Sequence, residues 1–532
     1  MNQANGDIKP TWDVIVIGGG PAGVHAALAA SDAGLRVALF DDNLQAGGQV
    51  YRAPYRLSAA IADSQRSADA LAGDALRARL AQSNVDTYFD HQVWAVTGHY
   101  RVDAVGPDGP MHCEAAALIV ASGTTERVVP FEGWTLPGVI GLAAATILLK
   151  SQNMLPGRTT LVAGCGPLLA AVAAKTIEGG GKVVALADIA SKQDWARTLP
   201  SMLSRRDLMQ QGWVWWRQIQ RAGTPVLSQY TIERVEAQGD QLRATLAPCD
   251  AVGRPVLGPR KAVVVDCVAV GHGLTPSSEI TRSLRAEHVY SRATGGWVAR
   301  ADAYGRTSRR GLFVAGDGAG IAGAQAAALH GTLAGLACVT DLQGHPQGQL
   351  QGHPQARLHT RGDHAYQRDA LSMAAETLDA HLAMRVPRQY ALQLPLPEAL
   401  TTALKAYQRA ARFGRAMGGL MALRVGHVDS ILPETVVCRC EDVTRAEIDA
   451  ACDAGAHDVN QLKAWTRCGM GPCQGRSCGD VAAELLARRT PQGSRESVGC
   501  FSARTPLRPL TIEALTGTFT YDDIPMPQAA PL

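Results

Sequence analysis

The sequence has few aromatic residues and almost no net charge. Aromatic residues make up 5% of the 532 residues, and 51 Lys and Arg against 48 Asp and Glu leave a formal net charge of +3. So small a charge gives no support for binding nucleic acid or a strongly acidic partner. A small organic substrate or another protein fits the composition better.

Long apolar runs are also missing. No window reaches eighteen apolar residues without a polar interruption, and the first twelve residues are polar and lack the apolar core of a secretion signal. Membrane spanning and secretion are therefore disfavoured, and no transmembrane segment is expected. The cytoplasm is the expected location, and a peripheral position at the inner membrane face stays open.

Cysteine is sparse over most of the chain and concentrated near its end. Of the twelve cysteines, five are scattered through the first 437 residues, at positions 113, 165, 249, 267 and 338, and the other seven lie between Cys438 and Cys500. A disulfide framework would not be so uneven, so the skew favours a metal centre. Cys165 also lacks a second cysteine two to five residues away, which disfavours a dithiol disulfide reductase.

At 532 residues the chain exceeds what one hydrophobic core organises, so three or more folding units are expected. The apolar run 14–17 enters Gly18-Gly19-Gly20-Pro21-Ala22-Gly23, and an alanine-rich helical stretch and a second apolar run, 37–40, follow. This order predicts a βαβ unit, and it recurs around Gly164-Cys165-Gly166. A third strand-plus-glycine element ends in Gly316-Asp317-Gly318. The chain is therefore predicted to be an α/β protein with two dinucleotide-type halves.

The first glycine loop has the residues that a dinucleotide needs. Gly18 permits the tight turn, Gly20 lets the backbone approach a pyrophosphate, and Gly23 lets the helix pack on the strand. Asp41 ends the second strand, where a carboxylate binds a ribose hydroxyl, and the complete pattern favours this role over that of a solvated turn acid. Asp317 suits a second contact to the ribitol and phosphates of a flavin.

Residues 119–124 form a strand that runs into small residues, as expected where the chain crosses between nucleotide halves, although a buried strand end is an equally good reading. The second glycine loop departs from the pattern because Leu169 occupies its third glycine position. Asp188 could still contact a ribose, so this loop could bind NAD, another adenine nucleotide or nothing. A structural remnant without a ligand is favoured over a working NAD(P)H site. Trp213, Trp215 and Trp216 are expected to pack in a core or an interface.

Four thiols have the spacing of an iron–sulfur site. Cys438 and Cys440 lie at i and i+2, so on an extended strand both point the same way and can hold one iron. Cys473 and Cys478 can curl around the other iron. A structural zinc site accepts the same thiolates, but the preceding flavin unit favours [2Fe–2S]. Cys468 could substitute as a ligand.

The surroundings of the thiols fit the same reading. Basic residues able to offset the charge of a cluster, and glycines able to leave backbone N–H groups near sulfur, are Arg439, Lys463, Arg467, Arg476, Gly469, Gly471, Gly475 and Gly479. Thr444 and Glu447 form a capping box that predicts the start of a short helix between the two cysteine pairs.

These motifs resemble a known family. The segments are residues 18–23, Gly47-Gly48-Gln49, 131–139 (FEGWTLPGV), 271–276, Gly316-Asp317, Cys438-Arg439-Cys440-Glu441 and 466–476 (TRCGMGPCQGR). Together they resemble the large, α-type subunit of heteromeric flavin-dependent amine dehydrogenases, a family that includes opine oxidase A subunits, D-hydroxyproline dehydrogenase α subunits and the B subunit of hydrogen cyanide synthase. The resemblance covers most of the chain outside the His/Pro linker and the tail.

The resemblance implies FAD and a [2Fe–2S] centre. The implied FAD residues are Gly18, Gly20, Pro21, Ala22, Asp41, Gly48, Gln49, Ser122, Gly123 and Asp317, and the implied cluster ligands are Cys438, Cys440, Cys473 and Cys478. Cys468 is a bystander on this reading. The implied fold is a Rossmann-like two-nucleotide flavoprotein, similar to disulfide reductases without the dithiol, plus a small α-rich domain of bacterioferritin-associated-ferredoxin type.

The predicted division of the chain follows from these motifs. It runs from a first FAD-binding part (1–140) through an inserted second nucleotide-binding domain (141–275), a closing FAD-binding part (276–342), a Gly/His/Pro/Gln linker (343–365), a helical adaptor (366–432) and the [2Fe–2S] domain (433–490) to an extended arm (491–532).

The resemblance also implies a function. A β-type partner with its own FAD, similar to sarcosine and D-amino-acid oxidases, takes hydride from an opine, D-hydroxyproline or a related amine, and the electrons cross to this chain; no residue here is assigned to catalysis. A further FMN or FAD at the interface and a small ferredoxin-like third subunit stay open. The alternatives are a self-contained NAD(P)H-dependent reductase and a non-catalytic iron–sulfur assembly or sensor protein.

Overall fold

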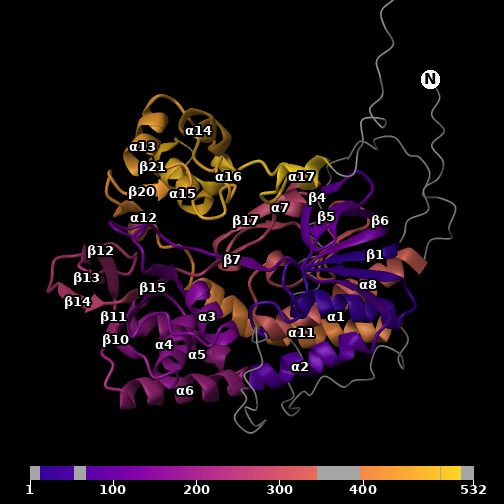
Figure 1. Cartoon of the computed structure of the whole chain (residues 1–532), viewed down its shortest axis with the longest axis horizontal. Coiled ribbons are helices and arrows are strands. Elements are labelled where there is room, and N and C mark those ends of the chain that lie inside the picture. Colours follow the sequence, from indigo (N-terminus) through magenta and orange to yellow (C-terminus); the bar gives the residue numbers. More distant parts are fainter. Residues whose placement is uncertain (1–11, 53–67, 344–395, 492, 517–532) are drawn as a thin grey trace, which may run out of the picture.

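A computed structural model describes residues 12–52, 68–343, 396–491 and 493–516 (Figure 1). Two nucleotide-type units lie side by side, one around β1 and α1 and the other around β10 and α4, and the C-terminal helices α13–α15 form a separate small body above the second unit. Within the described residues, we find no helix with the length and apolar character required to cross a bilayer.

The first unit is built on a seven-stranded sheet of order β3-β2-β1-β6-β5-β4, with β19 paired to β6. Its strands are β1 (Trp12–Ile17), β2 (Val37–Phe40), β3 (Val85–Tyr88), β4 (Gln92–Thr97), β5 (Arg101–Gly106), β6 (Gly109–Val120) and β19 (Leu312–Val314). The central strands β3, β2, β1, β6 and β19 are parallel, and β4 and β5 are antiparallel additions. Parallel strands covered on both faces need continuous apolar runs, which is why Val14–Ile17 is buried throughout.

Alanine and glycine let the helices of the first unit approach closely. Helix α1 (Pro21–Asp32) packs against α8 (Ala324–Gln343), and a Cβ atom on Gly331 would lie 1.9 Å from the Ala22 carbonyl oxygen. Helix α2 (Ala68–Ala81) completes this side of the unit. The contact fixes the start of α1 beside the end of β19, because a Cβ atom on Gly316 would lie 2.6 Å from the Ala22 Cβ.

The second unit has a five-stranded parallel sheet of order β11-β10-β9-β15-β8. Its strands and helices are β8 (Val139–Gly141), α3 (Leu142–Ser151), β9 (Thr159–Gly164), α4 (Leu168–Glu178), β10 (Lys182–Asp188), α5 (Lys192–Met202), α6 (Arg206–Arg221), β11 (Val226–Ser228) and β15 (Cys267–Gly271). An antiparallel sheet of β12 (Tyr230–Gln238), β13 (Gln241–Pro248) and β14 (Lys261–Val265) is attached to it.

Short elements join the units. These are β7 (Thr124–Glu126) paired with β16 (Leu274–Pro276), β17 (His288–Ser291) paired with β18 (Gly296–Ala299), and α7 (Glu279–Ser283). Helix α11 (Leu396–Leu420) packs on α8 and continues through residues 421–424 to α12 (Val425–Asp429). A Cβ atom on Gly414 would lie 1.9 Å from the Ala322 carbonyl oxygen, so α11 lies directly on the chain that follows β19.

The C-terminal body contains β20 (Val436–Cys438), β21 (Val443–Thr444), α13 (Arg445–Asp453), α14 (Val459–Thr466), α15 (Gly479–Arg489) and α16 (Arg495–Val498). The predicted capping box is confirmed, because the Thr444 side chain accepts from the Glu447 backbone N–H and the Glu447 carboxylate accepts from the Thr444 N–H. The chain then crosses the first unit, where the Leu507 N–H donates to the Trp94 carbonyl, and reaches α17 (Ile512–Thr516).

Some predictions fall outside the described residues or differ from the structure. The glycine- and histidine-rich repeat and residues 366–395 of the predicted adaptor lie outside the described ranges. Of the tryptophans expected to pack in a core or an interface, Trp213 and Trp216 are 58% and 46% exposed on α6, so these two are not core residues of this chain, and an interface role for them stays a prediction. Arg217 stacks over the Trp213 ring at 4.4 Å, so this face of α6 is amphipathic and open.

Candidate cofactor sites

The first glycine loop leaves the start of α1 free for a ligand. Gly18 has φ +110° and bends the chain between β1 and α1, and a Cβ atom on Gly23 would lie 1.7 Å from the Gly18 carbonyl oxygen. Gly20 is the N-cap of α1 and makes no side-chain capping bond. Because a helix begins with unpaired N–H groups and a partial positive charge, an uncapped start of this kind suits a phosphate.

Asp41 and Gly48 frame the same loop. The Asp41 carboxylate accepts hydrogen bonds from the Gly19 N–H and, at 2.8 Å, from the Asn43 N–H, and burial raises its pKa. Gly48 has φ +57°, and a Cβ atom there would lie 2.9 Å from the Gly20 Cα. The neighbouring Gln49 is exposed. The loop is thus lined by backbone and by one carboxylate, that of Asp41, at the predicted ribose position.

The other predicted FAD residues meet at the ends of β6 and β19. The Ser122 hydroxyl donates to the Ser277 carbonyl at 2.8 Å, and Gly123 has φ +68° with open space where a Cβ would be. Asp317 is half-buried, desolvation raises its pKa, and its carboxylate accepts from the Ala322 and Gly323 N–H groups at 2.9 and 3.0 Å. The structure therefore brings Gly18, Gly20, Pro21, Ala22, Asp41, Gly48, Ser122, Gly123 and Asp317 to one edge of the sheet. This uncapped helix with two carboxylates fits a dinucleotide such as FAD.

The second glycine loop is covered by the chain itself. A Cβ atom on Gly166 would lie 2.6 Å from the Met421 sulfur, and the Cys165 thiol donates to the Leu420 carbonyl at 3.3 Å. Met417 and Leu420 of α11 belong to one buried apolar cluster with Cys165. The end of α11 thus fills the space in front of α4 that a nucleotide's phosphates would need.

Asp188, the predicted ribose ligand of this second loop, is already paired. Its carboxylate accepts from the Trp195 indole N–H at 2.8 Å and from the Ala190 N–H at 2.9 Å, and burial raises its pKa to about 6. Leu169 is buried in the apolar core between α4 and the sheet. Asp188, Leu169 and Cys165 of the second loop therefore all have partners within the protein.

The thiols of the C-terminal body lie in two groups. The sulfurs of Cys438, Cys468 and Cys478 are buried within 4.8 Å of one another, and the Cys440 and Cys473 thiols, which are more exposed, hydrogen bond with each other. Hydrogen bonds from the Cys468 and Cys478 thiols lower the pKa of Cys438 to about 2. Soft sulfur ligands at this spacing fit iron or zinc.

This grouping differs from the pairing expected along the chain. Strand β20 ends at Cys438, and the Glu441 N–H donates to the Cys438 carbonyl, so the chain turns before Cys440. Because of this turn, Cys438 and Cys440 point to different ends of the site, and Cys438 is grouped with Cys478 instead. The four predicted ligands lie in one site. Each end of the site, however, combines one cysteine of the 438–440 segment with one of the 473–478 segment.

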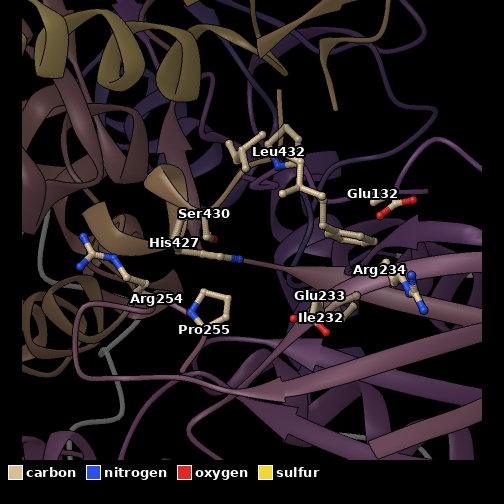
Figure 2. A pocket seen from close by; sticks show the side chains of 12 residues that line it. Glu132, Ile232, Glu233, Arg234, Arg254, Pro255, His427, Ser430 and Leu432 are labelled. Atoms are coloured by element: carbon tan, nitrogen blue, oxygen red, sulfur yellow. Dashed lines mark hydrogen bonds between the residues drawn. The ribbon is translucent and has the colours of Figure 1, made fainter. Parts of the chain in front are cut away.

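A cavity of about 380 Å³ lies between the second unit and the segment that leads to β20 (Figure 2). Figure 2 shows Ile232, Glu233 and Arg234 of β12 facing the side chains of His427, Ser430 and Leu432. None of the predicted site residues lines it. The cavity therefore lies at the boundary between two bodies, and no predicted cofactor ligand lines it.

Comparisons with known proteins agree with this geometry. The model of the pyridine nucleotide-disulphide oxidoreductase family matches residues 12–331. The chain is 31% identical to the opine oxidase A subunit of Agrobacterium tumefaciens (strain Ach5), over 96% of this chain and 92% of that protein. The chain belongs to the pyridine nucleotide-disulphide oxidoreductase family and is an α-type subunit of heteromeric flavoenzymes. A second model, that of the sarcosine oxidase A3 domain, matches residues 433–518 of the α-type subunit.

A further relative supports the same assignment, and a solved structure supports the fold class. The α-type subunit is 29% identical to hydrogen cyanide synthase subunit HcnB of Pseudomonas aeruginosa, over 94% of this chain and 97% of that protein. Its fold is similar to that of L-proline dehydrogenase from P. horikoshii, with a TM-score of 0.59, 20% identity and coverage of 95% of this chain and 79% of that one. The predicted family and fold class are confirmed.

Sequence reasoning missed a buried ionic clamp that fastens the thiol domain of the α-type subunit to its first unit. Asp480, in the first turn of α15, pairs with Arg127 at 2.6 Å and with Arg495 at 2.8 Å. Although burial works to raise the pKa of Asp480, the two guanidinium groups hold it below its ordinary value. Arg127 also donates to the Met421 carbonyl at 3.2 Å, so the same clamp holds the segment that covers the second loop.

Phe501 is a second residue that the sequence did not reveal. Cβ atoms on Gly469 and Gly475 would lie 2.8 and 2.5 Å from its ring, and one on Gly479 would lie 3.2 Å away. Three of the four glycines expected to leave N–H groups near sulfur therefore make room for this ring, and the Gly469 N–H also donates to the Cys438 sulfur, as expected. Arg467 pairs with Glu441 at 2.8 Å and Arg476 with Glu279 at 2.7 Å, so these two predicted counter-charges already have carboxylate partners.

Proposed function

We propose that this chain is the electron-transferring subunit of a heteromeric FAD-dependent dehydrogenase or oxidase of opines, D-hydroxyproline or related secondary amines. Its relatives are named as subunits of an opine oxidase and of a hydrogen cyanide synthase. The expected partner is a β-type FAD subunit that takes hydride from the substrate, with a further interface flavin and a ferredoxin-like third subunit as possible additions. We place the assembly in the cytoplasm or at the inner membrane face.

One observation carries the proposal: the flavin unit and the thiol domain are held together by buried charges. Arg127 follows the crossing strand that leads from Ser122 and Gly123, and its partner Asp480 lies two residues after Cys478. The Arg127 and Arg495 side chains are each only 4% exposed. Removing one partner of such a buried pair is costly, so the two bodies are kept in a fixed relation.

The residues near each cofactor would have distinct roles. The start of α1, at Gly20 to Ala22, would hold the pyrophosphate of FAD, Asp41 its ribose, and the Asp317 region the ribitol end. Cys438, Cys440, Cys473 and Cys478 would hold a [2Fe–2S] cluster. When bound, a flavin takes up electrons in pairs and an iron–sulfur cluster passes them singly. The ring of Phe501, against three glycines of the thiol loop, would exclude water from the cluster.

The covered second loop weighs against a self-contained NAD(P)H-dependent reductase. Met421 occupies the space beside Gly166, and Asp188 is bonded to Trp195. A nicotinamide nucleotide would have to displace the end of α11 from a buried apolar cluster. The remaining alternative, a non-catalytic assembly or sensor protein, predicts that no electrons pass between flavin and cluster.

The test is to purify the chain together with the product of its neighbouring gene. Flavin, iron and sulfide are measured, and secondary amines and D-amino acids are screened with an artificial dye acceptor. We expect FAD and iron in this chain, reduction by an amine, and no bleaching of the flavin by NADH. Freeze-quench electron paramagnetic resonance should show the cluster signal rising during turnover. Bleaching by NADH in the isolated chain, or a cluster that stays silent during turnover, would contradict the proposal.

A further inference from the structure

The thiol site holds five cysteines, one more than a [2Fe–2S] cluster takes. The buried end has three sulfurs, those of Cys438, Cys468 and Cys478, all within 4.8 Å of one another. The more exposed end has two, Cys440 and Cys473, which hydrogen bond with each other. Among the described residues, no third Cys, His, Asp or Glu joins that second pair in a group of this size. The two ends of the site therefore differ in their number of sulfurs.

Cys468 lies at the distance of a ligand that shares a metal with Cys478. Two thiolates on one tetrahedral metal, with metal–sulfur bonds of about 2.3 Å, are about 3.8 Å apart. The Cys468 and Cys478 sulfurs are 3.8 Å apart. A [2Fe–2S] cluster takes four cysteines on two irons, so each iron accepts two thiolates and three sulfurs cannot all bind one iron. The buried end thus offers three sulfurs for two positions.

The local backbone turns Cys468 inward. Helix α14 ends at Thr466, its C-cap Arg467 adopts the left-handed conformation at φ +63°, and the Cys468 N–H donates to the Thr466 hydroxyl at 3.2 Å. Cys468 has no exposed surface. A buried cysteine can simply fill apolar space in a core, but that role does not require its sulfur to lie beside two other sulfurs. The inward turn therefore delivers a third thiol to the metal position.

We propose that Cys468 is an exchangeable ligand: either Cys468 or Cys478 completes the buried iron together with Cys438. The exchange needs one sulfur to take the place of another 3.8 Å away. At the exposed end, no third cysteine of the described residues joins Cys440 and Cys473 in such a group. The inference rests on the cluster in the proposed function, and it predicts that the two ends of the cluster differ in their tolerance of substitution.

The test compares single and double variants of the full chain, co-purified anaerobically with its partner. Iron, acid-labile sulfide, the visible and circular dichroism spectra of the cluster, and flavin content are measured for C468A, C478A, the double variant C468A/C478A, C440A and C473A. We expect about two irons per chain in the wild type and in both C468A and C478A, with an altered cluster spectrum in C478A. The double variant, C440A and C473A should lose at least nine-tenths of the iron.

Flavin content is the matched control, because the flavin loop lies in a different unit and should stay loaded in every variant. Loss of iron in C478A alone, with flavin and secondary structure retained, would overturn the proposal, as would retention of iron in the double variant. A wild-type chain that contains zinc, or no metal, would instead contradict the proposed function. The two failures are thus distinguishable.

Discussion

The two glycine loops of this chain begin from the same βαβ design and end in opposite states. In the first, Gly20 precedes α1 without a side-chain cap, and Gly123 has open space beside it. In the second, a Cβ atom on Gly166 would lie 2.6 Å from the Met421 sulfur, and the Leu420 carbonyl accepts a hydrogen bond from the Cys165 thiol. A glycine motif therefore identifies a fold, whereas ligand binding also needs free space in front of the helix.

The electrostatics of the two loops differ in the same way. Asp41 and Asp188 both end the second strand of their βαβ unit, and burial raises both pKa values. Asp41 bonds only to groups of its own loops, the Gly19 N–H and Asn43. Asp188 is bonded by the Trp195 side chain, which belongs to the apolar cluster under α11. The second carboxylate is therefore part of a packed interface.

The largest effect is expected from Gly23→Ala in the first loop. The new Cβ would lie 1.7 Å from the Gly18 carbonyl oxygen, so the helix must move away from the strand that forms the phosphate site. We expect complete loss of flavin, measured by absorbance of the purified chain. The matched change in the second loop is Leu169→Met, which conserves volume in a buried position. Loss of flavin there as well would show that the two loops are not independent.

The next largest effect tests what holds the second loop closed. Asp480→Ala leaves Arg127 and Arg495 buried without their shared carboxylate, and breaking a buried pair in this way costs about 3–5 kcal/mol. Urea unfolding and limited proteolysis should show a less stable thiol domain and greater access to residues 420–424. The control is Glu233→Ala, which removes an exposed pair with Arg260. Equal behaviour of the two variants would mean that the clamp does not hold the bodies together.

The stability of the chain should also depend on pH through Glu126, which lies in β7 where the two units join. Glu126 accepts from the Ala143 N–H at 3.0 Å at the start of α3, and burial raises its pKa from 4.5 to about 7. A raised carboxyl pKa means that the folded state favours the protonated form, so this stability is present below pH 4.5 and is lost as the pH rises through 7.

Glu126→Gln should remove this pH dependence. At 1.36 kcal/mol for each pKa unit, we expect the wild type to lose up to about 3 kcal/mol relative to the variant between pH 5 and pH 8. Thermal unfolding of both proteins at the two pH values measures the difference. A constant difference across that range would show that Glu126 is ionised in the folded chain.

The first site could be predicted from sequence because its residues follow local rules. Gly18, Gly20 and Gly23 stand at fixed offsets after an apolar strand, and the Asp41 and Asp317 positions follow from strand ends. The start of α13 was predictable for the same reason, since Thr444 and Glu447 are three residues apart. Features that depend on residues close together in the chain can be predicted from their spacing.

The closed state of the second loop could not be predicted in this way. The contact joins Cys165 to Leu420, 255 residues apart, and no local pattern records such a meeting. Cys468 was set aside as a bystander, because spacing along the chain does not show that the turn after Cys438 groups it with Cys478. Arg127 and Asp480, 353 residues apart, give no signal either. The features that could not be predicted are tertiary contacts between segments that are distant in the sequence.

The smallest effect compares the two carboxylates directly. Asp41→Asn removes the charge at the predicted ribose position, and a hydrogen bond to a charged group is worth about 1.5–3 kcal/mol, so FAD affinity should fall about tenfold or more. Asp188→Asn should leave FAD affinity unchanged, because its partners Trp195 and Ala190 belong to the packed interface. Titration of the flavin-free protein with FAD, followed by fluorescence quenching, measures both. If the second variant lost affinity as strongly as the first, the carboxylate under α11 would have to reach the flavin site, and the contrast between an open loop and a filled one would fail.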